Sequence, residues 1–175
     1  MIPAGKRDLV VTPMGLRVGG RILPCTVGRG GITRHKREGD GATPVGHHRI
    51  VGMLYRPDRM ARPRDWAKPI GPYDLWSDDP TDVDYNMMVR APYPASHERL
   101  RRADPMYDLI LLTDWNWPYA VKGRGSAIFI HQWRRPGYPT AGCIGLSRHN
   151  LRTVAEFVGY GSRLIVTDCN HAPRK

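Results

Sequence analysis

Cys143 and His131 are the two residues of this chain whose types and placement are suited to nucleophilic catalysis. A cysteine attacks as its thiolate, and a nearby imidazole can take the proton and hold it. The two residues lie 12 positions apart (143 − 131 = 12), too far for neighbours on one helix, but a strand followed by a returning loop can bring them together. Gly142 lets the backbone approach a substrate closely, so its N–H and that of Cys143 are candidate donors to an oxyanion.

Spacing alone leaves a second interpretation open. A cysteine beside a glycine is more often a small buried hydrophobic residue than a nucleophile. The surrounding stretch is I-F-I-H-Q-W-R-R-P-G-Y-P-T-A-G-C-I-G-L, from 128 to 146. Its first part is apolar and β-prone, and a loop broken by proline and glycine follows. This order places the histidine at the end of a strand and the cysteine at the end of a loop.

A histidine followed by a loop, then Thr-x-Gly-Cys and an apolar residue, resembles the active-site signature of the YkuD-type L,D-transpeptidases, which remodel peptidoglycan. The usual signature has a longer gap, a second histidine before Gly-Cys, and a polar residue two places after the cysteine. Here the gap is short, Ala141 stands in place of the second histidine, and Gly145 stands in place of the polar residue. The chain therefore resembles a divergent branch that reads P-T-x-G-C.

The resemblance implies acyl transfer. Cys143 would attack a carbonyl of a peptidoglycan stem peptide, with His131 as base and later as acid, and the amides of Gly142 and Cys143 would stabilise the intermediate. An amine of a second stem peptide would then resolve the thioester into a cross-link, of the 3-3 type or of a shifted 1-3 type. If water resolves it, the enzyme is a carboxypeptidase or amidase. The implied chemistry needs no metal and no cofactor.

Four residues of the loop are predicted to bind substrate. Arg134 and Arg135 lie between base and nucleophile and can anchor a carboxylate, and Tyr138 and Thr140 follow them. The alternative for the arginines is a solvated basic loop. We also expect pairing with the histidine to lower the pKa of Cys143.

The charge of the chain is strongly positive, with a formal net charge of +11 and 22 arginines among its 27 basic residues. Such a chain can bind nucleic acid through phosphates, but arginine equally suits carboxylates, in which stem peptides are rich. The arginines are scattered and no nucleic-acid-binding motif is visible, so stem peptides are the expected partner and nucleic acid is not. A basic nucleic-acid-binding β-domain and a cysteine hydrolase acting on other amides are the rival classes.

Length and cysteine content set further bounds. The 175 residues suit a single catalytic domain spanning 1–175. No apolar run approaches the roughly 20 residues needed to span a bilayer, and the N-terminal segment lacks the apolar core of a signal peptide. The resemblance nevertheless implies the periplasm or cell envelope. A zinc site including Cys169 and His171 is conceivable, but paired ligand spacing is absent, so no metal is predicted.

The expected fold is mainly β, a YkuD-like β-sandwich with one helix after the nucleophile loop. Ser147 is a candidate N-cap for that helix, whose apolar residues recur at helical spacing. A further segment, at about 55–105, contains eight of the sixteen prolines and no apparent regular strand. We interpret it as an irregular insertion beside the cleft that contributes substrate contacts. Runs with strand character are Asp8–Thr12, Leu16–Val18, Arg21–Val27, His47–Leu54, Tyr107–Thr113, Ser126–His131 and Arg163–Thr167.

Overall fold

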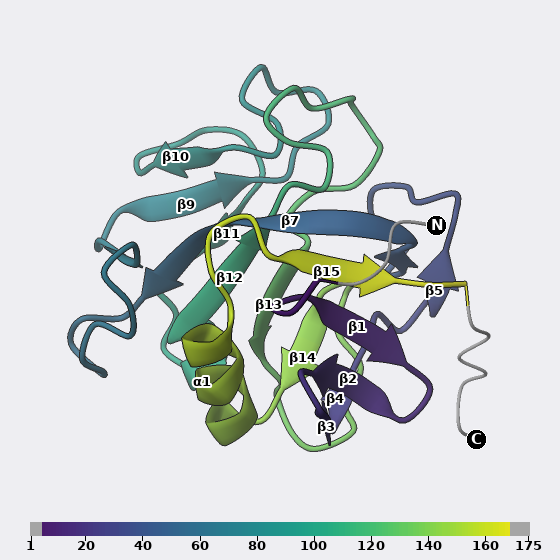
Figure 1. The fold of residues 1–175 in the computed structure, drawn as a ribbon. Coiled ribbons are helices and arrows are strands. Elements are labelled where there is room, and N and C mark those ends of the chain that lie inside the picture. The colour runs from purple at the N-terminus through teal and green to yellow at the C-terminus, as the bar shows by residue number, and fades with distance from the viewer. Residues whose placement is uncertain (1–4, 169–175) are drawn as a thin grey trace.

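The fold is described from a computed structural model, in which residues 5–168 are described. Cys169 and His171, the residues of the zinc alternative, lie outside this range. Within it, the chain is mainly β with one α-helix, as the sequence predicts (Figure 1). The elements are β1 (Leu9–Thr12), β2 (Gly15–Val18), β3 (Arg21–Leu23), β4 (Cys25–Thr26), β5 (Ile32–Thr33), β6 (Thr43–Pro44), β7 (Gly46–Tyr55), β8 (Lys68–Pro69), β9 (Asp74–Ser77), β10 (Met88–Arg90), β11 (His97–Arg99), the 3-10 helix η1 (Pro105–Tyr107), β12 (Leu109–Thr113), β13 (Phe129–Gln132), β14 (Ile144–Leu146), α1 (Arg148–Phe157) and β15 (Arg163–Val166).

One large sheet runs through the molecule in the order β3-β2-β1-β15-β7-β12-β13-β14-β4, with β8 added beside β7. Its two end strands, β3 and β4, are separated in the chain by Pro24 alone. The sheet therefore curls until its ends meet, and its apolar faces enclose the core as in a sandwich (Figure 1). The run 21–27 forms two strands because proline has no N–H for a continuous ladder.

The central strands follow from the apolar runs. In β12 four of the five residues are buried, as expected for a strand covered on both faces. It begins only at Leu109, because Asp104 accepts a hydrogen bond from the Met106 amide and starts the short helix η1 instead. β13 likewise starts at Phe129, later than predicted, after a left-handed residue at Ala127 with φ of 50°.

The helix α1 lies directly after the nucleophile loop, where the sequence predicts it. Ser147 is its N-cap, and the Ser147 hydroxyl accepts a hydrogen bond of 3.2 Å from the Asn150 amide. Leu151, Val154 and Ala155 are buried on the face that packs on the sheet (Figure 1). The packed helix follows β14 after one residue, and β14 begins directly after Cys143. The helix therefore anchors the strand that carries Cys143 at its start.

The segment 55–105 is more regular than expected. It contains β9, β10 and β11, which form a separate three-stranded antiparallel sheet. The expectation of no regular strand here is wrong because these strands have only three or four residues, too few for an apolar period to show between the prolines. Trp76 packs edge-on against Phe129 of β13, with ring centroids 4.9 Å apart, so the small sheet packs against the part of the large sheet next to Cys143.

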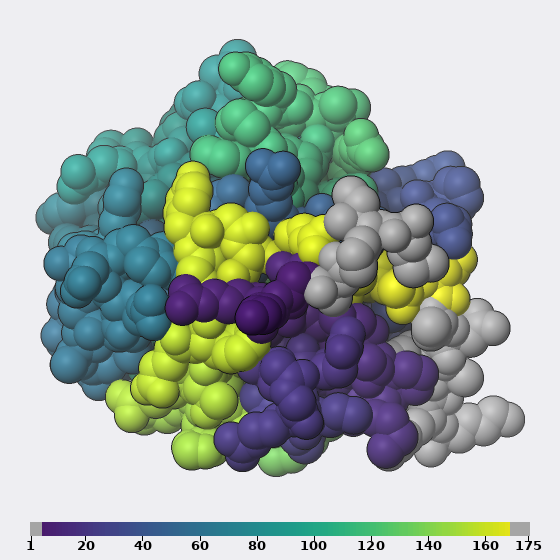
Figure 2. Space-filling view, in the orientation of Figure 1, coloured from purple at the N-terminus to yellow at the C-terminus, as the bar shows by residue number. Residues whose placement is uncertain are grey.

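A second loop, 114–125, lies beside this small sheet. The Nζ atom of Lys122 donates a hydrogen bond of 2.9 Å to the Thr81 carbonyl, and Asn86 Nδ2 donates one of 3.0 Å to the Trp115 carbonyl. In Figure 2 the two segments, teal and green, form the upper part of the molecule together. The loop 114–125 thus supports the small sheet by hydrogen bonds.

Candidate active site

Two neighbouring parallel strands bring His131 and Cys143 to one cavity. Strand β13 pairs with β14 so that Ile130 lies opposite Ile144 and His131 opposite Gly145. Cys143 precedes the first residue of β14, and both candidate catalytic residues line a cavity of about 640 Å³. A strand and a returning loop thus close the gap of 12 residues in the way that the sequence suggests.

The His131 ring is buried and held by a backbone group. Its Nδ1 atom lies 2.8 Å from the carbonyl oxygen of Gln132, and because a carbonyl can only accept, Nδ1 carries the proton and Nε2 is left as an acceptor. The Tyr107 ring stands edge-on to the imidazole, with centroids 5.1 Å apart. Burial lowers the pKa of His131 to about 4, so the ring is neutral near pH 7. A neutral imidazole with a free Nε2 has the form that a general base requires.

The Cys143 thiol is also buried. Its Sγ donates a hydrogen bond of 3.0 Å to the Ala127 carbonyl and accepts one of 3.3 Å from the Phe129 amide. Within residues 5–168 no hydrogen bond joins it to His131. Burial raises the pKa of Cys143 to about 12, and the charge of Glu98 acts in the same direction.

The expectation of a lowered pKa for Cys143 is therefore wrong for this state of the protein. An imidazole without charge cannot stabilise the thiolate, and loss of water around the sulfur disfavours the charged form. The resting form is the thiol.

Gly142 occupies a backbone conformation that favours glycine. Its φ is +139°, and a Cβ at this position would lie 2.9 Å from the Ala42 carbonyl oxygen. The Gly142 amide donates a hydrogen bond of 3.1 Å to the Thr140 hydroxyl, which itself donates one of 2.6 Å to the Cys143 carbonyl. Before this amide can bind an oxyanion, the Thr140 hydroxyl has to release it.

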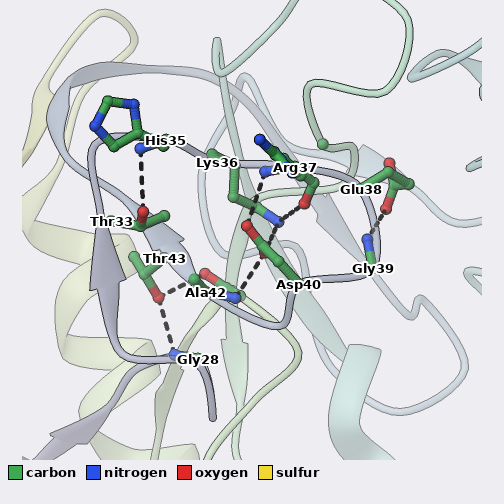
Figure 3. Close-up of polar contacts among 12 residues, drawn as sticks. Gly28, Thr33, His35, Lys36, Arg37, Glu38, Gly39, Asp40, Ala42 and Thr43 are labelled. Atoms are coloured by element: carbon green, nitrogen blue, oxygen red, sulfur yellow. Dashed lines mark hydrogen bonds and ion pairs between the residues drawn. The ribbon is translucent and has the colours of Figure 1, made fainter.

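The segment 28–43 fixes the carbonyl of Gly142 through the hydroxyl of Thr43. The Thr43 hydroxyl donates a hydrogen bond of 2.8 Å to it and accepts one of 2.9 Å from the Gly28 amide. Figure 3 shows this segment, in which Asp40 accepts from the Arg37 and Ala42 amides. The Nζ atom of Lys36, a buried side chain, forms an ion pair of 2.5 Å with Asp40. This segment therefore holds the nucleophile loop in place.

Three of the four residues predicted to bind substrate line the cavity, and one does not. Arg134, Tyr138 and Thr140 line the cavity, whereas Arg135 is not part of its wall. The guanidinium carbons of Arg134 and Arg135 lie 5.9 Å and 4.7 Å from the centroid of the Tyr138 ring. The arginines thus lie on an aromatic side chain at the rim of the cavity.

The absence of a polar side chain at position 145 has a steric cause. A Cβ on Gly145 would lie 2.5 Å from Thr26 Oγ1 and 3.1 Å from Thr140 Cγ2. The neighbouring strand β4 therefore fills the space that a longer residue would need. Any substrate contact made by a polar residue there has to come from elsewhere in this chain.

Several cavity residues are missed by sequence reasoning. They come from the segment 55–105, from η1 and from the turn before β6: Lys36, Asp78, Glu98, Arg102 and Tyr107. Of these residues, only Tyr107 belongs to a pattern that is visible in the sequence, because it begins the apolar run that becomes β12. The others are single charged residues in polar stretches, and only the three-dimensional fold shows that they face the nucleophile.

The fold and the site define a class of protein. It is a curled, mainly β domain in which a buried cysteine and a buried histidine line the same cavity. The model of the L,D-transpeptidase catalytic domain, YkuD, matches residues 8–166, and the chain belongs to this family. Among solved structures it is similar to an L,D-transpeptidase from Mycobacterium smegmatis, with 16% sequence identity and a TM-score of 0.42. That similarity covers 91% of this chain and 57% of the mycobacterial chain. No curated protein matches the chain in sequence.

Proposed function

We propose that this protein acts on peptidoglycan stem peptides as a cysteine acyltransferase, forming a thioester on Cys143. The observation that carries the proposal is that Cys143 and His131 line the same cavity in a chain of this family. No helix among residues 5–168 is long and apolar enough to cross a membrane. The proposed substrate implies a location in the periplasm or cell envelope.

The first half-reaction cleaves a peptide bond of the donor. Sγ attacks the carbonyl carbon while its proton passes to Nε2 of His131, which then gives that proton to the departing amine. The N–H of Cys143, together with that of Gly142 once Thr140 releases it, is the proposed donor set for the oxyanion. In the second half-reaction an amine of another stem peptide attacks the thioester, and a cross-link results.

The donor register is proposed to be shifted, with cleavage after the first stem residue and a cross-link from that residue to a diaminopimelate. Three features support a changed donor site. Position 145 has no room for a side chain, Ala141 has no polar group, and Arg134 supplies a new cation at the cavity wall. A site that loses polar partners for a substrate can change its selectivity by orders of magnitude.

Incubation with isolated disaccharide-peptides, followed by mass spectrometry, tests both parts. The expected products are a thioester on Cys143 and a dimer whose donor retains one stem residue. Cys143→Ala should abolish turnover while leaving the fold intact, since only a small side chain is removed. Cross-linking by a folded Cys143→Ala protein would end the assignment. A dimer joined only through two diaminopimelates would end the shifted register alone.

The same experiment separates the rival classes. Hydrolysis without an amine acceptor would make the protein a carboxypeptidase or amidase. Salt-sensitive binding of nucleic acid that survives the loss of Cys143 would instead favour a nucleic-acid-binding domain.

A further inference from the structure

Three carboxylates line the cavity without a contact ion pair, although the more distant charge of Arg102 acts on Glu98. Glu38, Asp78 and Glu98 all line it, and none of the three forms an ion pair among residues 5–168. This is unexpected in a chain with 27 basic and 16 acidic residues. Five cationic side chains line the same cavity. Lys36 and Arg102 are each paired with a different carboxylate, whereas Arg29, Arg99 and Arg134 form no ion pair among residues 5–168.

Asp78 carries the clearest sign of a missing partner. Its Oδ1 atom is buried and has no hydrogen-bond partner. A buried, unpaired carboxylate oxygen costs free energy unless a donor reaches it. Asp78 follows strand β9 directly, and its amide donates to the Ser96 carbonyl just before β11, which contains Glu98. The small sheet of the segment 55–105 thus places both carboxylates on one wall.

Glu98 connects this wall to the two candidate catalytic residues. Its Oε2 atom accepts a hydrogen bond of 2.5 Å from the Tyr107 hydroxyl, and the Tyr107 ring stands edge-on to His131. Its charge reaches the sulfur, because it contributes to the raised pKa of Cys143. A cation held at Glu98 therefore lies in the same cavity as Cys143 and His131.

We infer that Asp78 and Glu98 form a binding site for a primary ammonium group, which in the proposed reaction is the amine of the acceptor stem peptide. An ammonium has three donors, enough for both carboxylates and a third acceptor. Burial, reinforced by the charges of Asp78 and Glu38, raises the pKa of Glu98 against the opposing hydrogen bond from Tyr107 and the opposing charge of Arg102. Such a carboxylate is a stronger base than one in water. This inference rests on the proposed function for the identity of the amine.

The site gives the acceptor step a balanced route for its protons. Glu98 holds the ammonium and removes one proton, leaving a neutral amine. The nitrogen lone pair forms the C–N bond with the thioester carbon, and His131 takes a second proton from nitrogen. The C–S bond breaks, and the imidazolium returns that proton to sulfur. The products are an amide, the Cys143 thiol, neutral His131 and protonated Glu98, which releases its proton to solvent.

A comparison of two small nucleophiles at pH 7 tests the site. With disaccharide-tetrapeptide as donor, products of aminolysis and hydrolysis are measured for methylamine, which is a cation, and for semicarbazide, which is neutral. Glu98→Gln should lower the aminolysis-to-hydrolysis ratio for methylamine at least about tenfold, the loss expected for one charge-assisted contact, and change the ratio for semicarbazide less than about twofold. Asp78→Asn should act in the same direction and serves if Glu98→Gln does not fold.

The matched control is Glu156→Gln, which changes an exposed carboxylate on α1 and should leave both ratios as in the unchanged protein. An equal effect of Glu98→Gln on both nucleophiles, or no effect on either, would overturn the ammonium site.

A binding measurement keeps this test separate from the chemistry. Calorimetry with the Cys143→Ala protein compares a stem tetrapeptide bearing a free amine with its N-acetylated form. Acetylation should weaken binding at least about tenfold, and this difference should disappear in the Cys143→Ala, Glu98→Gln double variant. If acetylation weakens binding but the active protein forms no thioester on Cys143, the proposed function alone is refuted. If the active protein forms the thioester but acetylation does not weaken binding, the ammonium site alone is refuted.

Discussion

At Cys143 the requirements of folding and of chemistry oppose each other. The Cys143 side chain belongs to the buried apolar cluster that contains Phe129, and the same burial raises the free energy of the thiolate. Cys25, a half-buried residue of β4, has its pKa raised to about 12 by burial as well. The acid–base state of the free protein therefore does not distinguish the candidate nucleophile from a structural cysteine. The cavity and the neighbouring imidazole distinguish it.

We predict that alkylation of Cys143 in the substrate-free protein is slow at neutral pH and accelerates steadily with pH. Only the thiolate reacts, and with a pKa of about 12 its fraction rises about tenfold for each pH unit up to about pH 10. Brief iodoacetamide treatment between pH 7 and 10, followed by peptide mapping, measures the rate. A plateau near pH 7 would show an activated thiolate and contradict the desolvated state.

His131→Ala should lower kcat/KM at least about a hundredfold through loss of the general base. Because burial lowers the pKa of His131 to about 4, the ring is already unprotonated at pH 7. The acidic limb of the kcat/KM profile should therefore lie well below the usual range of histidine, and it should be absent from the variant. His149→Ala, an exposed histidine on α1, is the control and should keep the full profile. An unchanged profile in His131→Ala would remove this residue from the mechanism.

At the scale of elements, the helices and strands that can be predicted from sequence are those whose pattern of apolar residues extends over enough positions. Helix α1 shows its buried face every three or four residues, and β12 is an unbroken apolar run, so both are found from sequence. Strands β9 to β11 have three or four residues each, and half of the prolines lie near them, so no period can emerge. Cys143 and His131 are proposed from sequence because the residues around them resemble a family signature, although the gap between them is short. Asp78 and Glu98 are not, because their common position depends on the small sheet.

Thr43, the first residue of β6, offers a test of how an element positions the loop that ends at Cys143. Thr43→Val keeps the shape of the side chain but removes the donor to Gly142 and the acceptor for Gly28, both buried. Each unpaired buried backbone group costs about 1–3 kcal/mol, so we expect the free energy of unfolding to fall by roughly 2 kcal/mol or more. Activity should fall further than stability explains, because the carbonyl before Cys143 loses its anchor.

Chemical denaturation and turnover of the same Thr43→Val sample measure the two effects. Thr153→Val is the matched control, since its hydroxyl forms only a solvent-exposed hydrogen bond of 3.3 Å within α1. It should change the free energy of unfolding by no more than about 0.5 kcal/mol, the usual range for surface substitutions. Equal effects of the two substitutions would mean that the bonds of Thr43 do not hold the loop.

At the scale of the whole molecule, two histidines are buried in a neutral form. His48 is packed edge-on against Trp115 and has its Nε2 atom 3.0 Å from the Pro44 carbonyl oxygen. Burial lowers the pKa of His48, as it does for His131. One lies at the centre of the large sheet and the other at the cavity, so their titration reports on the integrity of the whole domain. Unfolding exposes both rings to water and restores a pKa near 6.5.

We predict that the free energy of unfolding falls as the pH is lowered from 7 to 5. A histidine with a lowered folded pKa stabilises the folded protein above its unfolded pKa, and this contribution is lost as pH falls toward the folded value, because the unfolded chain binds the proton first. For His131 the span from about 6.5 to about 4 corresponds to roughly 3 kcal/mol in total. Glu98 opposes the trend, because its pKa is raised and the folded protein takes up its proton first.

Urea denaturation at half-unit steps of pH measures this dependence. His48→Gln should flatten the curve between pH 7 and 5, because one proton fewer is bound on unfolding, whereas His149→Gln should leave the slope unchanged, since that residue is exposed in the folded state too. Asp8 and Asp40 have lowered pKa values, so their contributions are lost only at more acidic pH and do not enter this window. A His48→Gln curve identical to that of the unchanged protein would contradict the desolvated state of the His48 ring.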